Sequence, residues 1–193
     1  NYSDEAYLKQ RRILNPDIFK EMKNLYLKDF YSKPKYIKKK NGYILCAIDG
    51  SKIEIPNTPL NREIFGSEGN QRKRKIARAL LSGIYDVEID RVDSNEAKLA
   101  KRNIEAIQEI IGKNKEIIIF DRGYPAIEIF NWLEKQGKKF VMRLSSNDYI
   151  KEKEEMTTED EFIIIRYTYP RLNKIKKTNP EFYEEIKNEI GIE

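Results

Sequence analysis

Two aspartates, Asp49 and Asp121, each end a short apolar run of the sequence. Residues 44–48 (Ile-Leu-Cys-Ala-Ile) precede the first, and residues 117–120 (Ile-Ile-Ile-Phe) precede the second. Continuous apolar runs of this length are typical of central strands buried on both faces, so each carboxylate falls at an edge of the sheet. Neighbouring strands lie about 4.8 Å apart, which would let both carboxylates bind one cation. The pair therefore predicts a metal site.

The composition excludes several other kinds of site. The chain has no histidine and a single cysteine, Cys46, inside the first apolar run. A Ser-His-Asp triad, a Cys-His pair, a Cys/His zinc site and an intrachain disulfide are therefore excluded. Oxygen ligands remain, and these are the ligands that Mg²⁺ and Mn²⁺ prefer.

Nothing in the sequence points to a membrane. No apolar stretch approaches the roughly 20 residues that cross a bilayer, and no signal peptide opens the chain. We therefore expect an intracellular, cytoplasmic protein without a membrane partner. Its 193 residues suit one domain with a sizeable core and are too few for two domains of ordinary size.

The charge balance is mildly basic. The 37 Lys and Arg against 32 Asp and Glu give a net charge of +5, which is compatible with a polyanionic partner but does not establish one. One basic cluster could follow a DNA backbone, because neutralising phosphates is the main sequence-independent source of affinity. A solvated charged face is the commoner meaning of such a cluster. Its members are Arg72, Lys73, Arg74, Lys75 and Arg78.

The first half of the chain predicts two helices and then strands. Apolar residues recur at helical spacing over residues 3–31, and Asn15-Pro16 is a start signal for the second helix. A basic linker, residues 33–40, follows. The turn signal Gly50-Ser51 predicts a hairpin between strands at 44–49 and 52–56. Residues 56–70 then predict a loop, and residues 79–87 a third strand.

The second half predicts a βαβ unit. Asp93 is expected to cap a helix, with Glu96 reaching back in a capping box, and Gly112 to end it. The apolar run to Asp121 follows as a strand. A helix opening at Pro125 and a strand at 140–144 complete the unit, so these two strands are parallel. A lone strand at 162–169 and a helix after Asn179-Pro180 are expected near the end.

This order predicts a mixed α/β sheet of the RNase H-like class. Three early strands, expected to be antiparallel, precede a parallel βαβ unit, and the first and fourth strands become parallel neighbours. That arrangement brings Asp49 and Asp121 together, although the pattern also fits other α/β sheets. We divide the chain into a helical lead-in with a basic linker (1–42), an RNase H-like catalytic core (43–147) and a partial insertion region (148–193).

Four segments resemble the IS4 family of DDE transposases. They are residues 47–52 (Ala-Ile-Asp-Gly-Ser-Lys), 55–58 (Ile-Pro-Asn-Thr), 79–87 (Ala-Leu-Leu-Ser-Gly-Ile-Tyr-Asp-Val) and 120–125 (Phe-Asp-Arg-Gly-Tyr-Pro). The resemblance runs from residue 6 to residue 147. It implies a cut-and-paste recombinase with an RNase H-like core, in which two aspartates and a glutamate bind Mg²⁺ or Mn²⁺.

The resemblance assigns roles to individual residues. Asp49 matches the first catalytic aspartate of the family and Asp121 the second, so both are expected to be catalytic and to bind metal. Arg122 and Tyr124 follow in the same loop, where contact with DNA and ordinary packing are equally expected. The implied partner is double-stranded DNA, at the transposon ends and the target, with a homodimer in the synaptic complex as an expected assembly.

The third acid of the family is missing from the sequence. The resemblance puts it on a later helix, in the pattern Y-x2-R-x3-E-x6-K after a β-rich insertion, and no tyrosine here has Arg three residues on. We therefore expect a fragment that begins the insertion and is inactive alone. Two alternatives stay open. The chain could be a non-catalytic DNA-binding remnant of a transposase, or a stand-alone RNase H-like nuclease that recruits an acid from residues 152–161.

Overall fold

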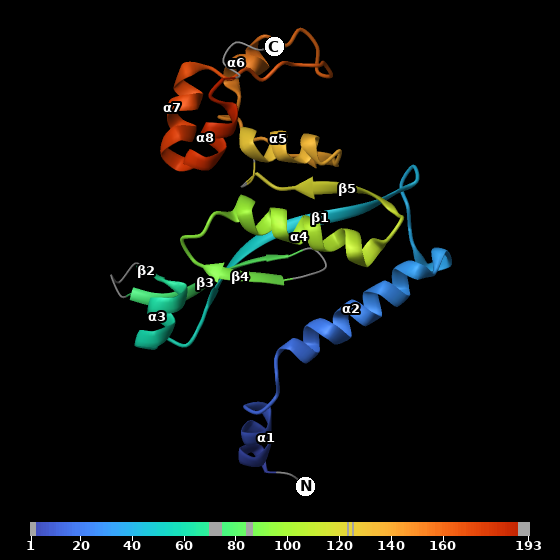
Figure 1. The fold of residues 1–193 in the computed structure, drawn as a ribbon, viewed down its shortest axis with the longest axis vertical. Helices are drawn as coiled ribbons and strands as arrows, with labels where there is room; N and C mark the ends of the chain where they lie inside the picture. The colour runs from blue at the N-terminus through green and yellow to red at the C-terminus, as the bar shows by residue number, and fades with distance from the viewer. Residues whose placement is uncertain (1–2, 70–74, 84–86, 123, 125, 189–193) are drawn as a thin grey trace.

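The computed structural model describes residues 3–69, 75–83, 87–122, 124 and 126–188. Within these residues, a six-stranded mixed sheet forms the centre of the molecule, with β4 pairing to β3 beside the path β2-β3-β1-β5-β6 (Figure 1). The strands are β1 (Tyr43–Glu54), β2 (Ser67–Gly69), β3 (Lys75–Gly83), β4 (Val87–Arg91), β5 (Lys115–Phe120) and β6 (Lys139–Met142).

Helices surround the sheet unevenly. Both α4 (Glu96–Ile111) and α5 (Ile127–Lys135) pack on one face of it. The lead-in helices α1 (Asp4–Arg11) and α2 (Asp17–Ser32) extend away from the body, and α2 contacts α4 (Figure 1). Among the described residues, no helix is both long and apolar enough to cross a membrane. The remaining helices are η1 (Pro34–Tyr36), α3 (Pro59–Phe65), α6 (Ile150–Glu154), α7 (Tyr169–Thr178) and α8 (Pro180–Ile186).

The predicted RNase H-like sheet is confirmed. β3 is antiparallel to both β1 and β4, whereas β5 is parallel to both β1 and β6. α5 joins the parallel strands β5 and β6, which gives the predicted βαβ unit. The first strand and the strand of residues 115–120 are parallel neighbours, as expected.

The predicted hairpin at Gly50-Ser51 is wrong, because β1 runs through it without a break. Residues 43–48 pair with β5, and residues 49–54 pair with β3. Gly50 does not have a positive φ, so it does not serve a turn. A Cβ placed on Gly50 would stand 3.1 Å from the Tyr124 hydroxyl oxygen. We infer that the glycine is there for the close approach of that side chain.

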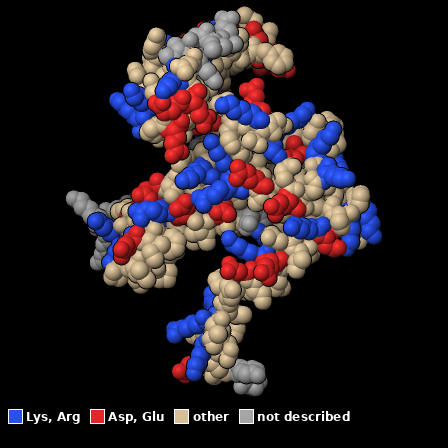
Figure 2. Space-filling view, in the orientation of Figure 1, with Lys and Arg blue, Asp and Glu red and all other residues tan. Residues whose placement is uncertain are grey.

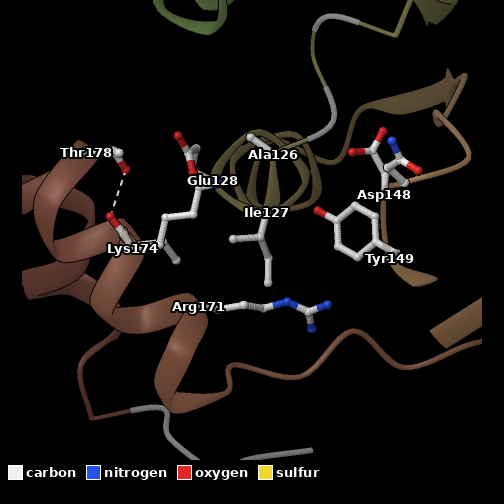
Figure 3. A pocket seen from close by; sticks show the side chains of 10 residues that line it. Ala126, Ile127, Glu128, Asp148, Tyr149, Arg171, Lys174 and Thr178 are labelled. Carbon is white, nitrogen blue, oxygen red and sulfur yellow. Dashed lines mark hydrogen bonds between the residues drawn. The ribbon is translucent and has the colours of Figure 1, made fainter. Parts of the chain in front are cut away.

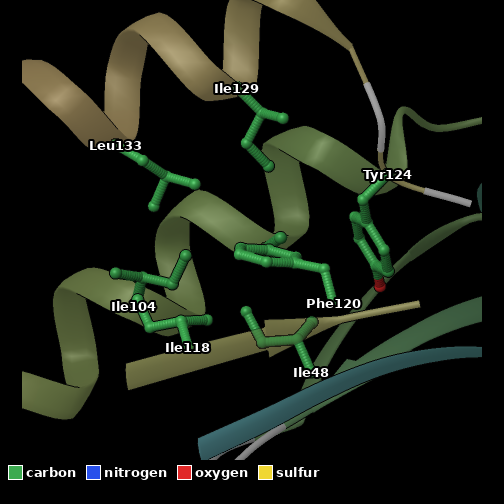
Figure 4. Packing of buried hydrophobic residues seen from close by; sticks show 8 residues of the cluster. Ile48, Ile104, Ile118, Phe120, Tyr124, Ile129 and Leu133 are labelled. Atoms are coloured by element: carbon green, nitrogen blue, oxygen red, sulfur yellow. The ribbon is translucent and has the colours of Figure 1, made fainter. Parts of the chain in front are cut away.

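The core lies between the sheet and the helices α4 and α5. Side chains alternate along a strand, so Ile48, Ile118 and Phe120 share one face and meet Ile104 of α4 and Leu133 of α5 (Figure 4). Each of these five is at most 2% exposed. Full burial of such a side chain stabilises the fold by about 1.5–3 kcal/mol, which fixes β1 and β5 rigidly beneath the two helices.

The opposite face of the parallel strands is open within the described residues. Leu45 of β1 is 49% exposed and Val141 of β6 is 58% exposed. Parallel strands are ordinarily covered on both faces, so this surface is unusual for its sheet. The same alternation assigns Asp49 of β1, and Asp121 directly after β5, to the open face.

Several predicted elements need correction. The predicted loop 56–70 contains α3 and β2. Thr58 caps α3 by accepting a hydrogen bond from the Asn61 N–H at 3.1 Å, and β2 pairs with β3. The predicted strand at 79–87 is two strands, β3 and β4, with residues 84–86 outside the described part. The helix α4 is capped by Asn95 rather than by Asp93.

The end of the chain is helical where the resemblance implied a β-rich insertion. The strand predicted at 162–169 is wrong: these residues pair with no strand among the described residues, and α7 begins at Tyr169. The described part from residue 148 onward contains α6, α7 and α8 and no strand. The helix expected after Asn179-Pro180 is confirmed as α8. The domain boundaries after residues 42 and 147 stay predictions.

Candidate metal centre

The register of β1 and β5 brings Asp49 and Asp121 together. Ile48 lies opposite Phe120 in the parallel ladder, so each aspartate is the next residue on its own chain segment. Adjacent strands are about 4.8 Å apart, and both aspartates leave the same edge on the same face. The core packing of Ile48 and Phe120 holds the two backbones in place.

Asp49 also marks a switch in strand pairing. β1 pairs with β5 up to Ile48 and with β3 from Asp49 onward. Ligand sites of α/β sheets form where neighbouring strands diverge in this way, because the divergence opens a crevice beyond the carboxyl ends of the parallel strands. The sequence reaches this geometry by following a buried apolar run with Asp and Gly.

Both carboxylates are free to take a cation. Asp49 and Asp121 are exposed, and neither side-chain carboxylate makes a hydrogen bond or an ion pair with another described residue. Two neighbouring carboxylates without a counterion repel each other, and a hard divalent cation with oxygen preference removes that cost. Among the described residues, no group of three His, Cys, Asp or Glu side chains is close enough to hold a metal ion. The donor set that fits Mg²⁺ or Mn²⁺ is therefore a pair.

Tyr124 lies in the core beside this pair. Its ring is 5.4 Å from that of Phe120, between centroids, and the residue is 3% exposed. Burial raises the pKa of Tyr124 to about 12; the Ser82 side chain lowers it, and the nearby carboxylates of Glu96, Asp49 and Asp121 raise it further. The side chain packs rather than facing solvent, so the structure gives no support to the predicted DNA contact of Tyr124.

Glu96 does not form the capping box that the sequence predicted. The expected capping box assigned its carboxylate to the helix start, but Asn95 takes the capping role through its side chain. Glu96 instead extends over Gly50, where its Cδ would lie 3.5 Å from an added Cβ. Asn95 is itself a preferred capping residue, and that signal would have left Glu96 unassigned.

Only Lys75 and Arg78 of the predicted DNA-binding cluster lie in the part of the chain that the structure describes. Arg72, Lys73 and Arg74 lie outside the described residues. Lys75 is exposed at the start of β3, whereas the Arg78 guanidinium is bound to Glu54 at 2.8 Å and Glu68 at 3.1 Å. The charge of Arg78 is thus already matched, and its contact with DNA stays a prediction.

Arg122 remains available next to the pair. It is exposed, follows Asp121 directly, and makes no ion pair within the described residues. The face drawn in Figure 2 carries Lys and Arg interspersed with Asp and Glu. Charge distribution over that face therefore does not by itself mark a path for DNA.

A pocket of about 440 Å³ lies between the start of α5 and α7, away from the aspartate pair. Arg171 is one of its walls, bound to Glu152 at 2.5 Å, with its guanidinium 5.2 Å from the Tyr149 ring centroid (Figure 3). Lys174 also lines it, but the acids Glu128 and Asp148 line it too, so its charges balance. Neither Asp49 nor Asp121 reaches it, and it is not the metal centre.

The comparison with protein families decides the class of this fold and site. The family model described as transposase DDE domain matches residues 40–189, which include every strand that the structure describes and both aspartates. The chain belongs to the transposase DDE domain family. No curated protein matches it. Membership supports transposase-type nuclease chemistry on DNA and the use of divalent metal ions. The match of this DDE domain continues through α8, across the boundary predicted at residue 147.

Proposed function

We propose that this DDE domain is part of the catalytic region of an IS4-like transposase. It binds Mg²⁺ or Mn²⁺ through Asp49 and Asp121 and serves cleavage and strand transfer at the ends of its element. The observation that supports the proposal is the β1–β5 register, in which Ile48 lies opposite Phe120, so that Asp49 and Asp121 are the next residues at the same end of two neighbouring parallel strands. We place the protein in the bacterial cytoplasm, at the nucleoid, with a homodimer as the assembly for synapsis.

The residues of this chain would hold and orient rather than transfer protons. When bound, divalent ions activate a water or a 3′-hydroxyl on one side of the phosphate and stabilise the leaving oxygen on the other. Asp49 and Asp121 supply the carboxylates, and the packed strands behind them limit their motion. Because α4 and α5 cover one face of the sheet, the scissile phosphate approaches from the other. Arg122 is positioned beside Asp121 to contact a DNA phosphate.

The missing third acid bears on the alternatives. The resemblance to the IS4 family implies a third acid, and among the described residues no group of three acids is close enough to hold a metal ion. The stand-alone nuclease would take it from residues 152–161, but Glu152 is bound to Arg171, and Glu161 accepts a hydrogen bond from the Thr157 N–H at 2.7 Å. Those two carboxylates are already used in local structure. The incomplete set also suits the non-catalytic DNA-binding remnant.

Metal binding by the chain of residues 1–193 tests the proposal. Titration with Mn²⁺, followed by electron paramagnetic resonance of the free ion, should show one site that is lost in Asp49→Asn and in Asp121→Asn. Asp17→Asn is the matched control, because Asp17 is an exposed aspartate outside the pair and outside residues 152–161. Binding that survives both substitutions at the pair would refute the metal centre.

DNA binding is tested separately. We expect weak binding to duplex without sequence preference, with affinity falling steeply as salt rises. Arg122→Ala should lower the slope of log K against log salt by about one. Lys113→Ala is the control, since Lys113 is exposed at the opposite end of β5. Absence of binding at low salt would count against this part of the proposal.

A further inference from the structure

Helix α2 is apolar on two faces, and the body of the molecule covers only one of them. Leu27 and Tyr31 pack against the buried cluster that β1 and α4 form. A helix at the surface of a domain ordinarily carries one apolar stripe, with polar residues on the opposite face. The second apolar face of α2 is therefore unusual, and it has no cover in the described structure.

This second face carries large apolar side chains that are exposed. We call them the α2 patch: Ile18, Phe19, Met22, Leu25 and Tyr26. Each is 44–71% exposed. At 3.6 residues per turn, the five fall within about one third of the helix circumference. Figure 1 shows the first part of α2 standing away from the sheet. A contiguous apolar patch on an exposed helix marks an interaction surface.

The patch has the spacing of a surface that pairs with another helix. Ile18, Met22 and Leu25 are four and three residues apart, which is the spacing of the core positions of a coiled coil. Phe19 and Tyr26 are seven residues apart and so lie along one edge of that core. The partner that this pattern fits is a second amphipathic helix.

Two residues of opposite charge lie along the other edge of the patch. Glu21 and Lys28 are also seven residues apart, both are exposed, and neither makes an ion pair with a described residue. In a two-fold pair of antiparallel helices, each edge meets the same edge of the other copy in the reverse direction. Glu21 of one copy then lies beside Lys28 of the other, and symmetry gives two such pairs. The patch is thus complementary in charge to itself.

We propose that the α2 patch is the interface of a homodimer, in which α2 packs antiparallel on α2 of a second copy. The proposal rests on the proposed function for the homodimer and adds its interface. Met22 of each copy meets Leu25 of the other in the middle, and Phe19 meets Tyr26 along one edge. A parallel pairing would set Glu21 against Tyr26 and form no ion pair there, so the charges favour the antiparallel one.

The interface is short, so the dimer should be weak. The core spacing stops at Asp29, whose carboxylate is paired with Lys33 at 2.5 Å. The largest apolar patch on a typical monomer measures roughly 300–600 Å², whereas a standard interface buries about 800 Å² on each partner. We therefore expect a dimer that dissociates on dilution through the micromolar range.

Sedimentation velocity of residues 1–193 over a range of concentrations tests the interface. Met22→Lys puts a charge at its centre in both copies, and the dissociation constant should rise about 10-fold or more. Ile64→Lys is the control, because it adds the same charge at an exposed apolar residue of α3 and should leave the constant unchanged. Both sites are exposed, so urea denaturation should show little change in stability. A chain that is monomeric at every concentration, or a dimer that Met22→Lys does not weaken, would overturn the inference.

Exchanging the two charges tests the orientation. Glu21→Lys and Lys28→Glu should each weaken the dimer about 3- to 10-fold, because each turns two attractions into repulsions. The double variant restores opposite charges across the two-fold axis, so it should dimerise as the unsubstituted chain does. Additive losses in the double variant would rule out the antiparallel arrangement.

Mn²⁺ binding measured on the same samples keeps this inference separate from the proposed function. Met22→Lys should retain the Mn²⁺ site, because α2 does not include either aspartate of the pair. If the unsubstituted chain dimerises through α2 and binds no Mn²⁺, the proposed metal centre fails and the interface stands. If the chain binds Mn²⁺ through Asp49 and Asp121 and stays monomeric, only the interface fails.

Discussion

Replacing Gly50 by alanine tests how closely Tyr124 approaches β1. Two opposing effects decide the outcome. Alanine is favoured over glycine inside a strand by about 0.5–1 kcal/mol, and Gly50 has no positive φ to forbid it. The new Cβ would lie 3.1 Å from the Tyr124 hydroxyl oxygen and 3.5 Å from the Glu96 Cδ. Crowding of this kind in a packed region costs about 1–3 kcal/mol.

The crowding should outweigh the strand preference of alanine, because the Tyr124 side chain cannot move aside. Its ring is buried against Phe120, whereas the Glu96 side chain is able to rotate. We expect Gly50→Ala to lower the free energy of unfolding by about 1 kcal/mol, which is a fall of about 2–4 °C in Tm for a chain of this size. Urea denaturation without metal measures it. Gly69→Ala is the control, since nothing lies within 4 Å of its Cβ position, and it should be neutral or slightly stabilising.

The same substitution in a Tyr124→Phe background gives the decisive comparison. Without the hydroxyl oxygen the crowding disappears, so Gly50→Ala should now stabilise the chain by about 0.5–1 kcal/mol. Tyr124→Phe alone should be neutral or stabilising, because it removes an unpaired buried hydroxyl. Equal destabilisation by Gly50→Ala in both backgrounds would show that the close approach is not the reason for the glycine.

Three further outcomes are expected. Leu133→Ala should cost about 2–5 kcal/mol in urea denaturation, because Leu133 is fully buried between α5 and the sheet; a loss under 1 kcal/mol would contradict that packing. Arg171 lowers the pKa of Glu152 below its ordinary value of 4.5, so their pair stabilises the fold above that pH and is lost as pH falls through the lowered value. Glu152→Gln should therefore lose less stability than the unsubstituted chain between pH 6 and pH 3, and parallel losses would contradict this. Finally, residues 1–193 should not nick DNA with Mg²⁺; nicking that disappears in Asp49→Ala would place the third ligand in this chain, with Glu154, Glu155 and Glu159 as first candidates.

The sheet was predictable because its signal is local. The buried runs that became β1 and β5, and the amphipathic pattern of α4, each specify an element and the face it buries. The parallel pairing of β1 with β5 followed from the strand order, in which a βαβ unit comes after the early antiparallel strands, as in an RNase H-like sheet. Because the two aspartates end those runs, their proximity followed as well.

The features that the sequence did not reveal depend on contacts with residues distant in the chain. Asp49-Gly50-Ser51 is a turn signal in isolation, and the pairing of residues 49–54 with β3 overrides it. The apolar residues 162–168 lack a partner strand among the described residues and stay irregular. Glu96 was assigned to a capping box by spacing alone, and only the competing cap at Asn95 frees it. In each case a tertiary contact decided between two locally acceptable structures.

The divided pairing of β1 has a consequence for the order of folding. Asp49 pairs with Gly83, 34 positions on (83 minus 49), but reaches Asp121 only 72 positions on (121 minus 49). Doubling a loop adds about 0.6 kcal/mol of closure entropy, so the antiparallel half of the sheet closes at lower cost. Amide protection in pulse-labelled refolding should therefore appear in β3 and β4 before β5. The two aspartates are then brought together late, after the antiparallel strands have paired.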